Sequence, residues 1–185
     1  MVKLAVIIGS TRPGRNGEAV GRWVHDIAAK RGDAEVGLVD LKDYNLPHLD
    51  EPMPAQMQQY VNPHTKAWSQ AVASYDAFVF VTPEYNRSTS GALKNAIDFL
   101  YAEWANKSAG FVGYGVAGGA RAVEHLRGVM SGIQIADVTA QVLLSMYTDF
   151  ENFSVFKPAA QQEEAVSMML DQVISWGGAL RAVRA

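Results

Sequence analysis

The feature that most constrains the fold is the alternation of unbroken apolar runs with stretches whose apolar residues recur at helical spacing. The runs are short and rich in β-branched residues, as in strands covered on both faces. They lie at residues 3–9, 34–41, 77–82 and 109–116, with a less regular one within 137–144. Because strand and helix alternate along the chain, parallel pairing with helices on both faces is the most economical architecture. The sequence therefore predicts an α/β fold, a flavodoxin-like doubly wound sheet of about five parallel strands.

The segments between these runs have the periodicity of amphipathic helices, with apolar residues three and four positions apart. This spacing predicts helices around residues 20–28, 63–74, 93–101, 123–130 and 166–177. We interpret the Pro-rich stretch 46–54 as a surface loop within a single domain spanning residues 1–185, because it breaks all periodicity. Three tryptophans are expected to cover the core, namely Trp23, Trp68 and Trp176.

Charge and residue content exclude several classes of function. The formal net charge is −3, whereas a nucleic-acid-binding protein usually carries a clear basic excess. The chain has no cysteine, which excludes disulfides, thiolate nucleophiles and cysteine metal sites. Its four histidines have no metal-ligand spacing, so we expect no metal site. No apolar run is long enough for a membrane span or a signal peptide, and we expect a cytoplasmic protein.

Three segments that follow predicted strands hold most of the candidate binding residues. They are residues 9–17, 82–91 and 115–121. The carboxyl ends of parallel strands meet at one edge of a sheet, and ligands of such folds bind beyond that edge. We therefore expect the three segments to surround one site.

The first segment, "GSTRPGRNG", combines hydroxyl groups, arginines and glycines directly before a predicted helix. Exposed backbone N–H groups and the helix dipole favour an anion there. The segment lacks the Gly-Lys-Ser/Thr ending of a triphosphate-binding loop, so a terminal monophosphate fits better. The alternative is a hydroxyl-capped turn with solvated arginines. The candidate ligands are Ser10, Thr11, Arg12, Arg15, Asn16 and Gly17.

The second segment begins "TPEYNRSTSG" and has the residues that a planar heterocycle would need. Pro83 fixes the backbone just past the strand, Tyr85 supplies a flat face, and Asn86 supplies a donor and an acceptor. Ser90 is a candidate helix cap, and a simple capped turn is the alternative interpretation. Lys94 and Asp98 are four residues apart and are expected to pair at the surface.

Together, "GSTRPGRNG" and "TPEYNRSTSGALKNAIDFL" resemble the NADPH-dependent FMN reductase family, which includes flavin, quinone, azo-dye and chromate reductases. The resemblance implies that the FMN phosphate is held by Ser10, Thr11, Arg12 and Asn16. It also implies that the isoalloxazine ring and ribityl chain are bordered by Pro83, Glu84, Tyr85 and Asn86. Members of the family often have serine where this chain has Arg15, which here would add a cation to the phosphate site.

The third segment contains Gly113-x-Gly115-x-x-Gly118, a literal match to the dinucleotide-binding fingerprint, with Asp137 about 20 residues further on. The match follows the fourth strand, which leaves too little chain for a nucleotide-binding half. The family resemblance instead implies that the backbone at this turn approaches the far edge of the flavin. The candidate residues are Ala117, Gly118 and Gly119. Glycines that ease a tight turn are the alternative.

The resemblance implies that hydride passes from NAD(P)H to bound FMN and then to a small-molecule acceptor, such as a quinone, flavin, azo compound or metal oxyanion. FMN carries this chemistry, so we expect no catalytic side chain. The family also implies a homodimer or a dimer of dimers. Phe99, Tyr101 and Trp104 are expected to form a subunit contact or a wall over the ring. The alternatives are a flavodoxin-type electron carrier and a flavin-free binding or regulatory protein.

Overall fold

The architecture is built on one parallel sheet, seen in a computed structural model that describes residues 1–184. The five strands are β1 (Val2–Ile8), β2 (Ala34–Asp40), β3 (Ala77–Pro83), β4 (Lys107–Gly115) and β5 (Ile135–Ser145). Their order is β2-β1-β3-β4-β5, and every pair is parallel. This confirms the flavodoxin-like prediction, and the irregular run within 137–144 belongs to a longer strand than expected.

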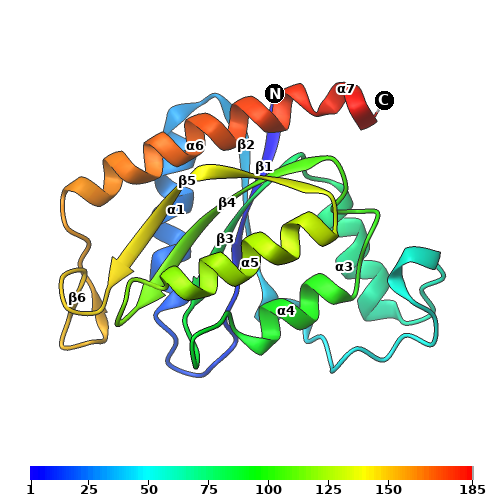
Figure 1. Ribbon diagram of the computed structural model, residues 1–185, viewed down its shortest axis with the longest axis horizontal. Helices are drawn as coiled ribbons and strands as arrows, with labels where there is room; N and C mark the ends of the chain where they lie inside the picture. The colour runs from blue at the N-terminus through cyan, green and yellow to red at the C-terminus, as the bar shows by residue number, and fades with distance from the viewer. Residues whose placement is uncertain (185) are drawn as a thin grey trace.

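Helices cover both faces of the sheet (Figure 1). One face is covered by α1 (Gly17–Arg31) and α6 (Gln161–Ala179), and the other by α3 (Pro63–Ala73), α4 (Gly91–Asp98) and α5 (Ala120–Gly132). Three short turns complete the helical elements, namely α2 (Leu41–Tyr44), a 3-10 turn at Ala55–Met57 and α7 (Arg181–Arg184). None of the helices in the described chain has the length and apolar composition that a membrane span requires.

The helical periodicity read from the sequence marks the faces that are buried. In α1 the side chains of Val20, Val24, Ile27 and Ala28 are buried, and the helix ends at Gly32 in the left-handed conformation. The tail behaves in the same way, since Val166, Met169, Leu170 and Val173 of α6 are fully buried. Burial of these stripes against an apolar sheet supplies the main stabilisation of a doubly wound fold.

Strand β3 lies at the centre of the sheet, and its residues contribute to the apolar clusters on both faces. Val79 and Val81 belong to the cluster beneath α1 and α6, whereas Phe78 and Phe80 belong to the cluster beneath the other three helices. All seven residues of β3 are buried, as an unbroken apolar run predicts.

The aromatic cluster at residues 99–104 does not have the expected role. Phe99 and Trp104 are fully buried, and Trp104 packs against Phe78 with ring centroids 5.0 Å apart. The Trp104 Nε1 group donates to the Ile97 carbonyl at 3.1 Å. Because α4 begins at the carboxyl edge of the sheet and runs back across it, residues beyond its C-terminus lie at the opposite edge. The prediction of a wall over the ring or a subunit contact is therefore wrong for these two residues.

Trp176 also departs from its prediction. Its side chain is 47% exposed, whereas Trp68 is buried and Trp23 is partly buried against the core. Trp176 shares a helix with the buried stripe of α6, but it falls on the solvent side of that helix.

The Pro-rich stretch is a surface loop, as predicted, and side chains hold it to the helices beside it. Asn95 of α4 donates to the Pro47 carbonyl at 2.7 Å and accepts from the Leu49 N–H at 3.0 Å. Glu51 accepts from the Val61 and Asn62 N–H groups at 2.8 and 3.0 Å, just before α3.

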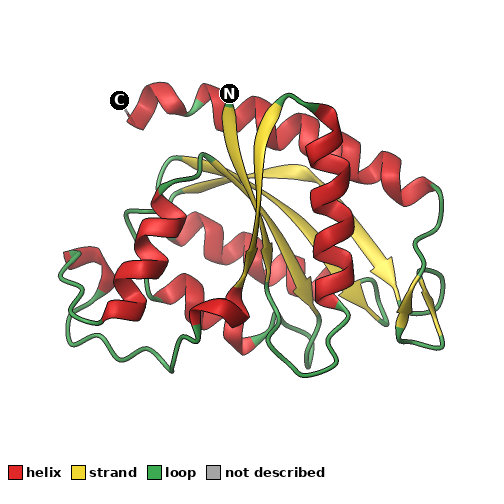
Figure 2. Cartoon of the chain, turned by 180° about the vertical axis from the view of Figure 1, so that it is seen from behind, coloured by secondary structure: helices red, strands yellow, loops and turns green. Residues whose placement is uncertain are grey.

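A small antiparallel hairpin after β5 was not expected from the sequence. Its strands are β6 (Phe150–Glu151) and β7 (Val155–Phe156). The hairpin lies at the carboxyl edge of the sheet, beside the end of β5 (Figures 1 and 2).

The burial of Trp104 predicts that replacing it costs much more unfolding free energy than replacing the exposed Trp176. Trp104→Ala removes a fully buried side chain and should lower the free energy of unfolding by about 3–5 kcal/mol. Trp176→Ala, the matched control at an exposed position, should change it by less than about 0.5 kcal/mol. Urea unfolding followed by circular dichroism measures both values. Equal losses in the two variants would contradict the assigned core.

Candidate functional site

The site begins at the point where the chain leaves β1 and β3, which are neighbours in the sheet but send their helices to opposite faces. The Gly9 N–H donates to the Val81 carbonyl at 2.8 Å. The Ser90 hydroxyl donates to the Gly9 carbonyl and accepts from the Leu93 N–H at 3.1 Å, which confirms Ser90 as the cap of α4. The first two candidate segments are thus joined at a topological switch point, where ligands bind in such sheets.

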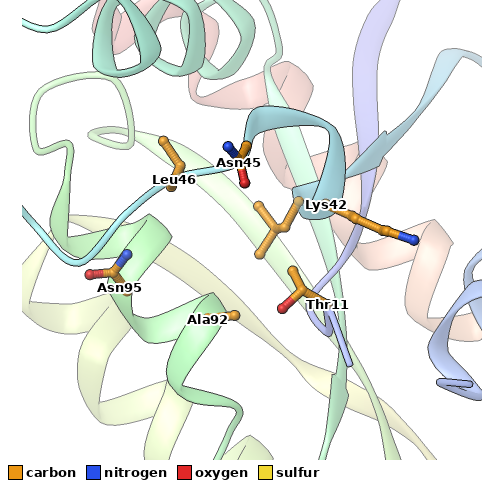
Figure 3. Close-up of a pocket in the computed structure, with 7 residues that line it drawn as sticks. Thr11, Lys42, Asn45, Leu46, Ala92 and Asn95 are labelled. Atoms are coloured by element: carbon orange, nitrogen blue, oxygen red, sulfur yellow. The ribbon is translucent and has the colours of Figure 1, made fainter. Parts of the chain in front are cut away.

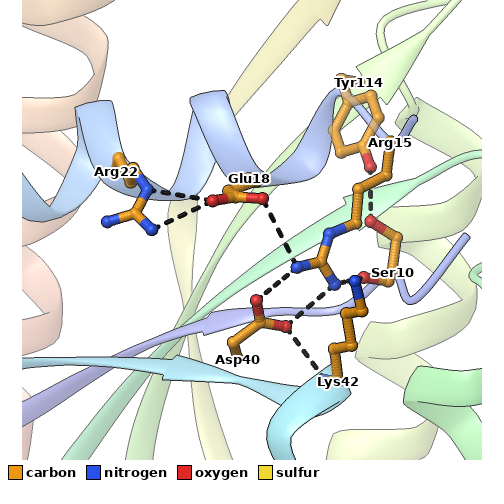
Figure 4. Close-up of polar contacts among 7 residues, drawn as sticks. All are labelled: Ser10, Arg15, Glu18, Arg22, Asp40, Lys42 and Tyr114. Atoms are coloured by element: carbon orange, nitrogen blue, oxygen red, sulfur yellow. Dashed lines mark hydrogen bonds and ion pairs between the residues drawn. The ribbon is translucent and has the colours of Figure 1, made fainter. Parts of the chain in front are cut away.

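Arg15 is held inside the protein, with a side chain that is only 6% exposed (Figure 4). Its Nη1 atom donates to Asp40 Oδ1 at 2.9 Å and to the Ser10 carbonyl at 2.5 Å. A second bond runs from Nη2 to the other oxygen of Asp40, which makes the pair bidentate. Arg15 therefore ties the first loop to the end of β2, and its charge is neutralised by Asp40.

Arg12 has a different environment from Arg15 although both lie in the same loop. Its side chain is exposed and lines a pocket at the carboxyl edge of the sheet. Within residues 1–184 no ion pair involves Arg12, so its cation remains available to a ligand.

The N-terminus of α1 opens towards the same pocket. Asn16 is its N-cap residue, and among the described residues no side chain caps the first turn through that position. The Asn16 side chain instead donates to the Phe153 carbonyl at 3.3 Å and lines the pocket. Uncapped N–H groups and the positive end of the helix dipole make such a terminus suitable for an anion.

Ser10 and Tyr114 form the buried floor behind the first loop. Their hydroxyl groups are 3.1 Å apart, and Ser10 is fully buried. Burial raises the pKa of Tyr114 to about 12, although the hydrogen bond with Ser10 opposes this shift. Tyr114 is therefore neutral at physiological pH and keeps its hydroxyl proton.

Gly17 is required where α1 passes over these hydroxyl groups. A Cβ atom at this position would lie 2.5 Å from Ser10 Oγ and 2.6 Å from the Tyr114 hydroxyl. Both distances are far below ordinary van der Waals contact, so only glycine allows this close approach of the helix. Gly17 thus acts through packing beneath the loop.

The second segment forms a tight two-residue turn. The Tyr85 N–H donates to the Ser88 carbonyl at 2.9 Å, and the Ser88 N–H returns a bond to Tyr85 at 3.1 Å. Asn86 and Arg87 at the tip have φ values of 49° and 71°, as a hairpin turn of this type requires. Asn86 therefore lies exposed at the tip, and Tyr85 lines the pocket with its side chain 37% exposed.

Glu84 connects the second segment with the third. Its N–H donates to the Tyr114 carbonyl at 3.0 Å, and its carboxylate accepts from the Arg121 Nε at 2.6 Å. The carboxylate also accepts from the Arg121 backbone N–H at 3.2 Å, in the first turn of α5. The Glu84 carboxylate is thus paired with Arg121 at the start of α5, and the Glu84 backbone lies beside the pocket.

The glycines of the third segment pack against each other. Gly118 and Gly119 have φ values of 67° and 76°, and a Cβ atom on Gly119 would lie 2.6 Å from the Tyr114 nitrogen. They are buried beneath the turn, whereas Ala117 is exposed on it. Asp137 lies near the start of β5, at the opposite edge of the sheet, where it pairs with Arg127. It cannot serve a nucleotide at the glycine turn, so the fingerprint match has no dinucleotide geometry.

The three segments meet around a pocket of about 210 Å³. Five predicted residues line it, namely Arg12, Asn16, Pro83, Glu84 and Tyr85. Gly115 and Val116 of the third candidate segment also line it, and three lining residues were not predicted, namely Tyr114, Met146 and Phe153. The position of Tyr114 between two glycines at the end of a strand was a usable signal, whereas nothing in the local sequence placed Phe153 near Arg12.

Thr11 faces a second pocket, of about 240 Å³, on the other side of the first loop (Figure 3). Asn45, Leu46, Ala92 and Asn95 also line this pocket, and the Lys42 side chain extends away from it. The first loop therefore lies between two pockets, and Arg12 lines the one that Tyr85 also lines. No group of acidic or histidine side chains in residues 1–184 is arranged to hold a metal ion.

Comparison with known proteins gives a consistent result. The model of the NADPH-dependent FMN reductase family matches residues 2–149. An NAD(P)H-dependent FMN reductase of Nectria sp is 39% identical over 172 residues, covering 89% of this chain and 86% of the relative. A 2-hydroxy-1,4-benzoquinone reductase of Burkholderia sp is 30% identical over 141 residues, covering 72% and 73%. The flavoenzyme FerB, an NAD(P)H:(acceptor) oxidoreductase from Paracoccus denitrificans, has a similar fold with a TM-score of 0.74, 22% identity and coverage of 96% and 98%.

The contact of Gly17 with the buried hydroxyl pair predicts the effect of one added methyl group. Gly17→Ala should lower the free energy of unfolding by about 1–3 kcal/mol, because the enclosed Tyr114 ring has little room to move. Gly128→Ala in α5, where no atom lies within 4 Å of the new Cβ, should be neutral or stabilise by up to about 1 kcal/mol. Chemical denaturation of both variants measures the difference, and a stable Gly17→Ala variant would contradict the packing described.

Proposed function

Since the chain belongs to the NADPH-dependent FMN reductase family, whose members are oxidoreductases, we propose that the pocket beside Arg12 is its FMN site. The assignment rests mainly on one observation. The uncapped N-terminus of α1 and the available cation of Arg12 adjoin a pocket walled by the turns after β3 and β4. We also propose that the chain forms one FMN-binding domain, since both apolar clusters pack on the same sheet.

The phosphate end of the cofactor is assigned to the first loop. Arg12 supplies the cation, the first turn of α1 supplies N–H groups, and Asn16 supplies an amide. Arg15 positions this loop through Asp40 and the Ser10 carbonyl rather than reaching the phosphate. Thr11 faces the neighbouring hollow, so its contribution to the phosphate is through the backbone.

The ring end is assigned to the two turns that follow β3 and β4. Pro83, Glu84 and Tyr85 form one wall, and the backbone at Gly115 and Val116 forms another. Gly118 and Gly119 support this second wall, because the missing side chain of Gly119 lets the turn close on Gly113 and that of Gly118 lets it approach Leu143. The polar edge of a flavin would meet main-chain N–H and C=O groups there.

FMN, when bound, supplies the redox chemistry by taking hydride from a reduced nicotinamide and passing two electrons to an acceptor. The protein's own residues bind and orient. The neutral Tyr114 hydroxyl and Ser10 support the loop from below, and the Glu84–Arg121 ion pair keeps the carboxylate charge away from the ring. We propose a quinone or related small aromatic molecule as acceptor, in keeping with the benzoquinone reductase among the relatives.

We further propose a homodimer or a dimer of dimers in the cytoplasm. A group of exposed apolar side chains on the loop before α3 supports association, namely Leu49, Met53, Met57 and Val61. A cytoplasmic location agrees with the consumption of reduced nicotinamide. Light scattering on the purified chain distinguishes these assemblies from a monomer.

The reductase proposal predicts rapid reduction of the bound cofactor. Purified protein loaded with FMN and mixed with NADPH or NADH under anaerobic conditions should lose its yellow absorbance within seconds, because the nicotinamide reacts directly at the site. Adding a quinone should restore the colour. Stopped-flow absorbance near the flavin maximum follows both steps. A holoprotein that stays yellow would favour the electron-carrier alternative, and a chain that takes up no FMN would favour the flavin-free one.

The assignment of the phosphate predicts that one arginine matters and a second does not. Arg12→Ala should weaken FMN binding by about 10-fold to 100-fold, as expected for the loss of a charge-assisted hydrogen bond. Arg22→Ala is the matched control, since Arg22 is exposed on α1 and pairs with Glu18. Lys94→Ala removes a cation that pairs with Asp98 on α4 and should likewise leave affinity unchanged. Calorimetric titration with FMN at low salt measures the affinities, and equal affinity in all three variants would remove the phosphate assignment.

A further inference from the structure

The hairpin of β6 and β7 presents an aromatic tip to the pocket. Asn152 and Phe153 form its turn, with φ values of 50° and 57°. Phe153 lines the pocket together with Arg12 and Tyr85, although it lies far from both in sequence. The match to the family model ends at residue 149, directly before the hairpin. The hairpin therefore lies outside the matched residues, although it lines the same pocket.

The base of this hairpin is firmly anchored. Asp149 is fully buried, and its carboxylate accepts from the Ser145 N–H at 2.9 Å and the Ala159 N–H at 3.0 Å. Phe156 packs against Phe150, with ring centroids 5.2 Å apart, and also against Trp23 of α1. These contacts with buried groups therefore fix the position of the hairpin tip.

The tip, in contrast, exposes large apolar surfaces. Phe153 is 56% exposed and Tyr147 is 68% exposed, and their rings meet edge to face with centroids 5.4 Å apart. Asn16 donates to the Phe153 carbonyl at 3.3 Å, which fixes the tip to the first loop. An aromatic residue with positive φ is uncommon and costs free energy, and strain of this kind is concentrated at functional sites.

We propose that Phe153, supported by Tyr147, determines acceptor specificity by stacking on a planar aromatic electron acceptor. This inference rests on the proposed function. Phe153 lines the proposed FMN pocket and is exposed to solvent, so an exchangeable substrate can reach its ring. Residues 152–154 carry no positive charge, so the tip has no group that would attract a metal oxyanion. The chemistry of the tip selects a ring over an inorganic ion.

The test compares two acceptors that differ in aromaticity. Wild-type and variant holoproteins are first checked for bound FMN by absorbance, and kcat/KM is then measured for a fused-ring naphthoquinone and for ferricyanide. Phe153→Leu keeps an apolar side chain without a ring and should lower kcat/KM for the naphthoquinone about fivefold to tenfold. The value for ferricyanide, which has no ring to stack, should stay within about twofold.

Two further variants separate stacking from structural damage. Phe153→Tyr keeps the ring and should retain the wild-type preference for the naphthoquinone. Val155→Ala removes an equally exposed side chain of the same hairpin, outside the pocket, and should have no effect. Equal losses for both acceptors in Phe153→Leu, or a loss of FMN affinity, would overturn the proposal and assign the ring to the cofactor or to the fold. A wild-type protein that binds no FMN would instead overturn the proposed function itself.

Discussion

The site depends on the pairing of β1 with β3 in the middle of the sheet. Their register places Ile8 opposite Val81, so β1 ends two residues before Pro83, the end of β3, at the same edge of the sheet. From that point the chain turns to α1 on one face and to α4 on the other, and a crevice opens between the two exits. The Gly9 bond to Val81 and the Ser90 bond to Gly9 close the bottom of that crevice. The binding roles proposed for the first two segments follow from this local geometry.

The contrast between Arg12 and Arg15 shows how burial assigns roles to identical side chains. Arg15 is enclosed, and a buried guanidinium is tolerated only with a carboxylate and hydrogen-bond acceptors around it. Asp40 and the Ser10 carbonyl meet that requirement. Arg12 is solvated, so it needs no partner within the protein and can exchange water for a ligand. The sequence offers both arginines as equal candidates, because the partner of Arg15 lies on β2, which only the folded sheet brings close.

Elements with long periodic patterns were predictable from the sequence, and contacts between distant segments were not. The strands and the buried faces of α1 and α6 follow directly from unbroken or periodic apolar residues. The strands of the β6–β7 hairpin are 2 residues each, too short to show a period. Its position against Asn16 depends on the buried Asp149, whose partners lie on both sides in sequence. The exposure of Trp176 has a related cause, since helix periodicity specifies which residues share a face but not how wide the covered surface is.

The hydrogen bonds of Arg15 have a consequence for the thermodynamics of ligand association. The loop is already immobilised by contacts within the protein, so an arriving mononucleotide need not pay for ordering its receptor. Such preorganisation leaves the favourable enthalpy of the phosphate contacts largely uncompensated by lost backbone entropy. It also means that the first loop need not unfold when the ligand leaves. The dissociation rate is then governed by the strength of the contacts between the ligand and the protein. A reductase with this loop would be able to release and rebind FMN at the proposed site while remaining folded.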